Sequence, residues 1–208
     1  MPEKMNFAES DAVDVITHYD LLIEENNDPF RDPPALQDYM NLWDGAPFLE
    51  AMELSKEKTV LEIGIGTGRI ANGVAPNCLR LVGVDISPKT LERAKENLRA
   101  HSNISYICAD FSKHLFSERF DVVYSSLTMM HFKDKRAVVS RVADLLNDGG
   151  LFCLSIDKNQ APYINMGTRK LQIYPDTLDS TTSLINETAM SVDRVVETEH
   201  AYLIVSRK

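Results

Sequence analysis

A glycine-rich segment and two carboxylates are the residues of this sequence whose types and spacing could build a ligand site. Residues 62–70 read Glu-Ile-Gly-Ile-Gly-Thr-Gly-Arg-Ile, so that Gly64, Gly66 and Gly68 alternate just after a short apolar run. Glycines placed in this way let the backbone turn sharply and approach a ligand without a Cβ between them. A helix predicted to start at about Gly68 would aim its unpaired N–H groups at that ligand.

Asp85 and Asp110 follow two further apolar runs, residues 81–84 and 104–108. If the runs are parallel strands, both acids lie at the carboxyl edge of the sheet, beside the glycine loop. A carboxylate at position 85 can accept hydrogen bonds from ribose hydroxyls. One at position 110 can accept from the adenine amine while Phe111 packs on the ring. Simpler readings stay open, with Asp85 as a cap for the helix after Ser87 and Asp110 as a turn residue.

The elements that position these acids alternate between strands and helices. Apolar runs of buried-strand length occupy residues 59–63, 81–84, 104–108, 120–124 and 151–156. One helix is predicted from Ser87-Pro88, where Ser suits the cap and Pro the first turn, and another over residues 135–146, ending at Gly149-Gly150. This alternation predicts right-handed βαβ units and a parallel sheet with helices on both faces.

The two ends of the chain depart from this pattern. Residues 192–196 and 201–205 are strand-like, and the four residues between them are too few for a crossover helix, which predicts an antiparallel pair. Near the N-terminus, helices are predicted at about residues 11–25 and 35–52, the second with a break near Gly45-Ala46-Pro47. We therefore predict a helical cap over residues 1–54 and a main domain over residues 55–208.

Over about residues 55–208 the sequence resembles the class I S-adenosylmethionine-dependent methyltransferases. The resemblance rests on the glycine loop and on four further motifs: Gly-Val-Asp-Ile-Ser at 83–87, Ala-Asp-Phe at 109–111, Phe-Asp-Val-Val at 120–123 and Leu-Leu-Asn-Asp-Gly-Gly at 145–150. It implies an α/β fold, namely a three-layer Rossmann-like sandwich. The sheet would be seven-stranded and mainly parallel, with a C-terminal antiparallel hairpin and the N-terminal helical cap.

The resemblance also implies a function and a set of cofactor-binding residues. The chain would transfer a methyl group from S-adenosylmethionine to a small-molecule acceptor by in-line displacement, releasing S-adenosylhomocysteine, without a metal. In this family the glycines lie along the methionine moiety, and the acids after the second and third strands bind ribose and adenine. Glu62 would brace the loop or meet the ligand's ammonium through water. The implied cofactor-binding residues are Glu62, Gly64, Gly66, Gly68, Asp85, Ile86, Asp110, Phe111 and Ser125.

The acceptor is expected beyond the fourth strand. His131 is the best candidate for a general base there because an unperturbed histidine titrates near pH 6.5, although a core histidine is an equally open reading. Tyr19 and Trp43 lie in a front segment that we predict to close as a lid, and packing of the cap would explain them as well. The predicted substrate and lid residues are Tyr19, Trp43, Ser126, Tyr163 and Arg169. The remaining histidines, His18 among them, look like surface residues.

Composition limits the partners. The 208 residues carry a net charge of −9, and residues 1–58 hold 14 acidic against 4 basic side chains. Because the sequence has no basic stripe, we do not expect it to bind nucleic acid. No apolar run reaches the roughly 20 residues of a membrane span, and the start has no secretory pattern, which together predict a cytoplasmic protein. Cys78, Cys108 and Cys153, an odd number without CxxC spacing, are predicted to be buried apolar fillers. We expect a monomer or homodimer.

Two other functions stay open. Gly66, Gly68 and Ala71 satisfy the GxGxxA dinucleotide fingerprint, with Asp85 19 residues after Gly66, as in NAD(P)-dependent oxidoreductases. Against this, no Tyr precedes a Lys by four residues, so the catalytic pair of single-domain dehydrogenases is missing. A non-catalytic nucleoside-binding protein on the same fold also fits, because fold does not fix function.

Overall fold

The computed structural model describes residues 12–208; residues 1–11, which include the start of the predicted cap, lie outside the described part. Its centre is a seven-stranded sheet in the order β4-β3-β2-β5-β6-β10-β9. The strands are β2 (Thr59–Ile63), β3 (Arg80–Asp85), β4 (Ile104–Cys108), β5 (Phe120–Ser126), β6 (Leu146–Asp157), β9 (Ser191–Glu197) and β10 (Ala201–Arg207). The first five in spatial order are parallel. β10 pairs antiparallel with β6 and β9, which confirms the predicted hairpin.

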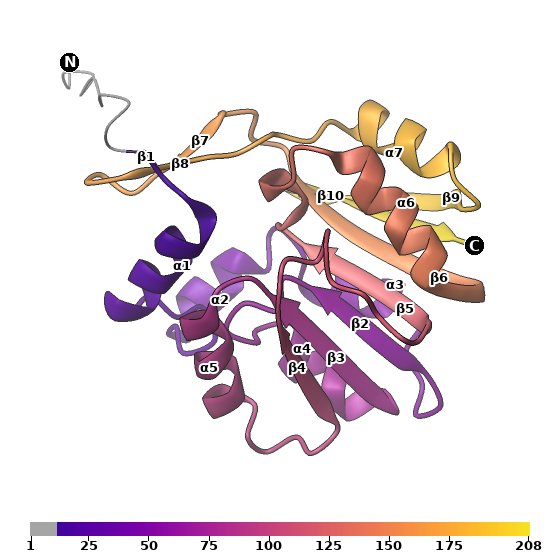
Figure 1. Ribbon diagram of the computed structural model, residues 1–208, viewed down its shortest axis with the longest axis horizontal. Coiled ribbons are helices and arrows are strands. Elements are labelled where there is room, and N and C mark those ends of the chain that lie inside the picture. The colour runs from indigo at the N-terminus through magenta and orange to yellow at the C-terminus, as the bar shows by residue number, and fades with distance from the viewer. Residues whose placement is uncertain (1–11) are drawn as a thin grey trace.

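Helices cover both faces of this sheet (Figure 1). α6 (Lys135–Leu145) and α7 (Leu178–Asn186) pack on one face, and α3 (Gly45–Ala51), α4 (Ala71–Val74), η2 (Ala75–Asn77) and α5 (Pro88–Asn97) lie on the other. Successive strand residues alternate between the two cores, so that Leu61 packs in the first and Val60 in the second. This arrangement is the predicted three-layer sandwich.

The N-terminal helices differ from the prediction in where they break. α1 spans Val15–Glu24, and the helix expected over residues 35–52 is two helices, α2 (Pro34–Met40) and α3. The chain leaves the helical path before Gly45, at Asp44, whose φ of −146° and ψ of −84° are not helical. α3 precedes the predicted cap boundary at residue 54, yet its Phe48 is fully buried in the core of the main sheet.

Two helix ends differ from the prediction: glycines delay the start of α4, whereas Gly149-Gly150, predicted to end α6, lie within β6. α4 begins at Ala71 and not at about Gly68, because Gly66 and Gly68 have φ values of +56° and +96°, which a right-handed helix excludes. α6 ends at Leu145, and β6 starts at Leu146, several residues before the predicted strand. The early start of β6 coincides with a register irregularity against β5 between Phe120 and Val122.

A second, three-stranded sheet was not predicted. It consists of β1 (Ala12–Val13), β8 (Lys170–Gln172) and β7 (Tyr163–Asn165), with β1 parallel to β8 and β7 antiparallel to it. These strands are two or three residues long, too short for a periodic apolar pattern. In Figure 1 the small sheet continues directly into α1, so it brings the segment after β6 beside the cap.

Two predictions of burial were wrong. Cys108 is exposed because it ends β4, an edge strand that pairs only with β3, whereas Cys78 and Cys153 are buried as expected. His18, expected at the surface, is 1% exposed. Its ring packs edge-on against Tyr19, and the charges of Arg169 and Glu25 act on it, which places it where the small sheet meets α1.

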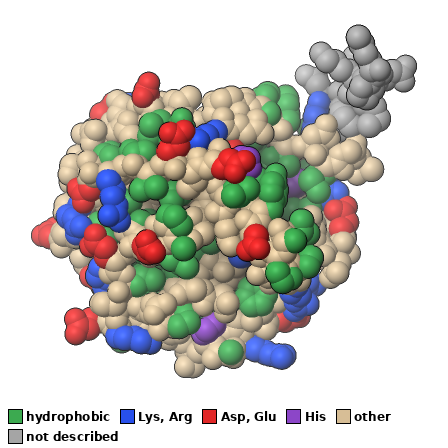
Figure 2. Space-filling view, turned by 180° about the vertical axis from the view of Figure 1, so that it is seen from behind, with side chains coloured by type: hydrophobic (Ala, Val, Ile, Leu, Met, Phe, Trp, Pro, Cys, Tyr) green, Lys and Arg blue, Asp and Glu red, His purple; other side chains and the backbone are tan. Residues whose placement is uncertain are grey.

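On the face shown in Figure 2, acidic, basic and apolar side chains are interspersed. Neither sign of charge forms a continuous stripe on that face. Among residues 12–208, no helix has the length and apolar character needed to cross a membrane.

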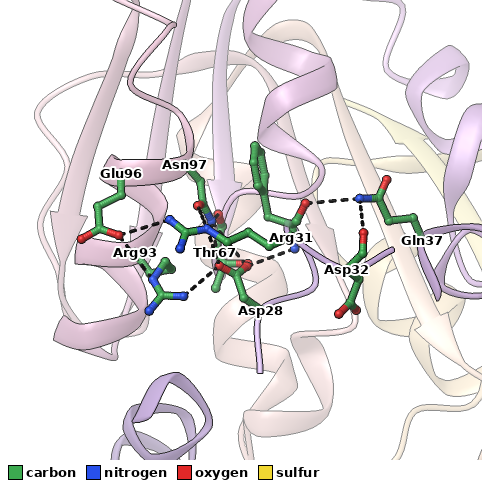
Figure 3. Close-up of polar contacts among 9 residues, drawn as sticks. Asp28, Arg31, Asp32, Gln37, Thr67, Arg93, Glu96 and Asn97 are labelled. Carbon is green, nitrogen blue, oxygen red and sulfur yellow. Dashed lines mark hydrogen bonds and ion pairs between the residues drawn. The ribbon is translucent and has the colours of Figure 1, made fainter. Parts of the chain in front are cut away.

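The turn after α1 is held by a buried carboxylate. Asp28, 3% exposed, accepts hydrogen bonds from Arg93 (3.2 Å) and Asn97 (3.1 Å) of α5 and forms an ion pair with Arg31 (3.4 Å; Figure 3). Asn97 also donates to the Thr67 carbonyl in the glycine loop (3.0 Å). The cap is thereby tied to the helix and the loop that border the candidate site.

Replacing Asp28 by Asn should lower the free energy of unfolding by about 1–3 kcal/mol, because it removes the charged partner of a largely buried arginine. Asp32→Asn in the same turn is the matched control. Only the backbone carbonyl of Asp32 accepts the Gln37 amide, so a change within about 0.5 kcal/mol is expected. Urea unfolding of both variants measures the difference, and equal losses would contradict the role given to Asp28.

Candidate functional site

A cavity of about 720 Å³ lies at the carboxyl edge of the parallel strands. Its walls come from α1, the turn after it, the end of α2, the glycine loop, the ends of β3 and β4, the segment after β5 and the start of α6. All of the predicted cofactor-binding residues except Gly68 and Ser125 line it. Elements far apart in the sequence therefore meet around one space of a size usual for small ligands.

The glycine loop is shaped by close packing on one side and by open space on the other. A Cβ on Gly64 (φ +76°) would lie 2.3 Å from the Thr128 hydroxyl, so only glycine fits there. A Cβ on Gly66 (φ +56°) would meet no protein atom within 4 Å. Gly66 lines the cavity, so its bare backbone leaves room for a ligand to approach the loop.

The Asp85 carboxylate is fixed by two backbone amides. Its Oδ2 accepts from Gly66 N–H (2.9 Å) and its Oδ1 from Ser87 N–H (3.0 Å). Each oxygen keeps a further lone pair for a ligand. Burial raises the pKa of Asp85 even though these amide hydrogen bonds act to lower it. The cap of α5 is Ser87 itself, whose hydroxyl accepts from Thr90 N–H, so Asp85 is not consumed as a helix cap.

Asp110 and Phe111 form the next part of the wall. The Asp110 Oδ1 accepts from the backbone (2.9 Å) and hydroxyl (2.6 Å) of Ser112, and Lys113 pairs with Oδ2 at 2.9 Å. Partial burial tends to raise the pKa of Asp110, but these partners outweigh it and the pKa is lowered. Phe111 is 3% exposed and packs against Phe116 and other rings of the first core.

Glu62 lies beneath the loop at the end of β2. It is 3% exposed, and the Tyr124 hydroxyl donates to its Oε2 at 2.6 Å. Burial raises the pKa of Glu62 well above its ordinary value. Ser125 is fully buried and donates from its hydroxyl to the Ile63 carbonyl (3.2 Å), so the adjacent residue, Ser126, lines the cavity instead.

Tyr19 of α1 and His131 of η3 (Met129–His131) meet at the cavity wall. The Tyr19 hydroxyl lies 2.8 Å from His131 Nε2, and the two rings are perpendicular. Burial, reinforced by the charges of His18 and Lys135, lowers the pKa of His131 to about 4. Burial also raises the pKa of Tyr19, so at neutral pH this is a neutral imidazole beside a protonated phenol.

The other predicted substrate residues lie away from this cavity. Tyr163 lines a second cavity of about 380 Å³, which shares only Leu127 with the first. Arg169 is 6% exposed and forms two hydrogen bonds with Glu25, at 2.5 and 2.7 Å, joining the small sheet to α1. Trp43 packs on His200 with ring centres 4.4 Å apart and lines neither cavity.

Sequence reasoning missed Asp44 and its partner Arg69. Asp44 is fully buried and accepts from Arg69 Nη1 (3.0 Å) and Nη2 (2.5 Å) and from the Ser126 hydroxyl (2.7 Å). It thus joins the cap to the glycine loop and to the end of β5. In the sequence the only signal was an acid directly before a glycine in an otherwise acidic segment, which does not distinguish it from its exposed neighbours.

Residues 61–154 match the family model described as a methyltransferase domain. Of the solved structures, N-methyltransferase NodS from Bradyrhizobium japonicum WM9, in complex with S-adenosyl-l-homocysteine, aligns with a TM-score of 0.70 at 20% identity and covers 91% of this chain and 97% of that one. Residues 61–154 therefore resemble a methyltransferase domain, and the chain has the class I methyltransferase fold. The matched residues include the glycine loop and both acids of the cavity.

This chain spans only part of the length of the curated relatives that it matches. Nodulation protein S of Sinorhizobium fredii is 24% identical over 140 residues, which span 65% of this chain and 61% of that protein. The methyltransferase fold also carries other chemistry: the [4+2]-cyclase SpnF aligns with a TM-score of 0.74 at 15% identity, covering 93% of this chain and 95% of that one. The fold therefore does not fix the activity, which depends on the residues of the site.

The residues that line the cavity fit S-adenosylmethionine. Asp85 and Asp110 supply the acceptors that ribose hydroxyls and an adenine amine need, and Gly66 leaves its backbone open to the cavity. Among residues 12–208, no group of three or more His, Cys, Asp or Glu side chains is arranged to hold a metal ion.

The low pKa of His131 should appear in the pH dependence of stability. Between the ordinary pKa of 6.5 and the folded value of about 4, the unfolded chain binds a proton that the folded chain excludes. Acidification from pH 7 to 5 should therefore cost about 1–2 kcal/mol more in wild type than in His131→Asn. Urea unfolding at both pH values measures this difference.

The comparison with the variant is needed because other groups also titrate. The raised pKa values of Glu62 and Asp85 act in the opposite direction, and the lowered pKa of His18 acts in the same one. These contributions cancel between wild type and variant. Parallel pH profiles for the two proteins would show that His131 is not shifted.

Proposed function

We propose that the protein transfers a methyl group from S-adenosylmethionine to a small-molecule acceptor. The observation that carries the proposal is the placement of Asp85 and Asp110 on one cavity wall, at the ends of adjacent strands, beside the open backbone of Gly66. A nucleoside needs acceptors for its ribose hydroxyls and for its amine, and in sheets of this kind nucleotides bind at the carboxyl ends of the parallel strands. The similarity to S-adenosylhomocysteine-bound NodS supports the same ligand class.

When bound, S-adenosylmethionine supplies a sulfonium methyl group, which is the reactive part of the chemistry. The protein's contribution is to position the reactants and to exclude water. We assign ribose to Asp85 and the adenine ring to Asp110, Phe111 and Ile86. The glycine loop and Glu62 are then left to contact the methionine end of the cofactor.

We infer that α1 is the lid over this site. Val15, Tyr19, Leu22 and Ile23 line the cavity at the three- and four-residue spacing of one helix face. Side-chain contacts hold the helix in place, including the Asp20 carboxylate, which accepts from the Ser87 hydroxyl at 2.6 Å. A ligand would gain access when these contacts open.

The Tyr19–His131 pair supports a route for the acceptor's proton. We propose that the acceptor's nucleophilic atom gives its proton to the Tyr19 oxygen while the Tyr19 hydroxyl proton passes to His131 Nε2. The pKa of His131, about 4, leaves its imidazole unprotonated at neutral pH and so free to accept, and the same shift makes it a weaker base than an ordinary histidine.

We also propose that the protein acts in the cytoplasm, because its three free cysteines suit a reducing compartment.

Ligand identity can be tested with the Gly66→Ala variant. Wild type should be stabilised thermally by S-adenosylhomocysteine and not by NAD or NADP, because only a native-state ligand raises the melting temperature. Gly66→Ala has space for its Cβ and should fold with a loss of about 1–2 kcal/mol, from its left-handed backbone. It should lose the ligand shift, since the methyl group would occupy cavity space. Stabilisation of wild type by NAD alone would refute the proposal.

The proton route can be tested by a double-mutant cycle. For an acceptor identified by screening amines and alcohols, His131→Ala and Tyr19→Phe should each reduce methyl transfer by about 10²–10⁴-fold. The double variant should be no slower than the worse single one. Binding of S-adenosylhomocysteine should change little in His131→Ala. Tyr39→Phe, an exposed tyrosine of the cap, is the matched control. Full activity in Tyr19→Phe would exclude the relay.

A further inference from the structure

Arg69 lies in the cavity wall, and the proposed function assigns no role to it. It follows Gly68 directly, so the glycine loop and its guanidinium belong to the same turn. Its side chain is 17% exposed and lines the cavity, as do Glu62, Gly66 and Ser126. These residues surround the end of the cavity that we assign to the methionine moiety.

The guanidinium has donors to spare. Asp44 takes one N–H from Nη1 and one from Nη2, and Asn41 takes a second from Nη1 at 3.4 Å. An arginine carries five such groups. Within residues 12–208, no acceptor lies on the Nε–H or on the remaining Nη2–H, so the ion pair with Asp44 orients the guanidinium without saturating it.

The charges around this end of the cavity match an α-amino acid. Glu62 offers a carboxyl group, and Arg69 offers a planar cation close enough for its charge to act on Glu62. A free amino-acid end carries one ammonium and one carboxylate, and it needs one partner of each sign. Arginine is the side chain best suited to a carboxylate, because its donors form a fixed fork.

We propose, on the basis of the proposed function, that Arg69 binds the carboxylate of the ligand's amino-acid end and that Asp44 is the positioning residue that holds its guanidinium. The cap would then contribute to cofactor recognition through a fully buried carboxylate that itself contacts no ligand. Ser126, which donates to the same carboxylate, links this arrangement to the end of β5.

A purely structural role for Arg69 makes a different prediction, and the chain provides the control for it. Arg93 is also 17% exposed and pairs with a buried cap carboxylate, that of Asp28 (Figure 3). Arg93 does not line the cavity. If Arg69 serves only to anchor the cap, replacing either arginine should have the same effect on ligand binding.

The test compares two ligands that differ by one group: S-adenosylhomocysteine and its decarboxylated analogue, which keeps the ammonium. Calorimetry on the full chain should show that wild type prefers S-adenosylhomocysteine by at least about tenfold. Arg69→Met should lose at least about tenfold in affinity for S-adenosylhomocysteine and less than about threefold for the analogue. Arg93→Met should change both affinities by a similar factor.

Two milder variants keep the test valid if Arg69→Met does not fold. Arg69→Lys retains the charge but not the fork and should lose part of the preference. Asp44→Asn should lower it too, by freeing the guanidinium. Folded Arg69 variants that weaken both ligands equally, or neither, would overturn the proposal. A wild type that binds neither ligand would instead refute the proposed function, so the two failures are distinguishable.

Discussion

The hydrogen bond from Gly66 N–H to the Asp85 carboxylate is the contact on which the cavity depends. It joins the loop after β2 to the end of β3, the neighbouring parallel strand. Since Ser87 N–H holds the second oxygen, the carboxylate is fixed in the absence of a ligand and still has lone pairs to offer. A group ordered in advance adds no ordering cost on binding. The same bond helps to set the path of the glycine loop between β2 and α4.

Two ion pairs of the same kind, each between a buried carboxylate and an arginine, attach the cap to the main domain. Asp28 and Asp44 are 3% and 0% exposed, and each binds an arginine of the main domain. A buried carboxylate without its partner is costly, so each pair strongly favours one docking position. Both acids follow α1 in the chain, which leaves α1 itself held by contacts such as Tyr19 with His131. A lid requires a fixed attachment, here the segment with Asp28 and Asp44, and a helix whose own contacts can open separately, here α1.

The sequence was most informative where a local pattern has one physical cause. Buried parallel strands give continuous apolar runs, and the β2 and β4 bounds agree with those runs. Ser87-Pro88 marks a helix start, and the Ser87 hydroxyl does accept from Thr90 N–H. These features need only neighbours in sequence or in the sheet ladder, which periodicity and spacing reveal.

What could not be predicted depends on contacts between distant segments. Asp44 meets Arg69 25 residues away and Ser126 82 residues away, and no local pattern distinguishes it from other acids of the cap. His18 is buried against Tyr19 and near Arg169, which adjoins the small sheet, and the strands of that sheet are too short to show a period. Arg169 was predicted at the substrate site because of its position after β6, but its guanidinium binds Glu25, 144 residues away.

The charge of the cavity explains why these distant contacts matter. Glu62, Asp85 and Asp110 place three carboxyl groups around one partly enclosed space, and burial raises the pKa of the first two. Without a ligand, ionising all three is unfavourable, and the Tyr124 hydroxyl and Arg69 offset only part of this cost at Glu62. A cationic ligand end would favour the ionised form, so its binding would be coupled to proton release. In the arrangement that we propose, Asp44 fixes the direction in which Arg69, placed among these acids, offers its donors to an anion. The site would then distinguish the two charges of an amino acid by orientation, since its overall charge would repel the carboxylate.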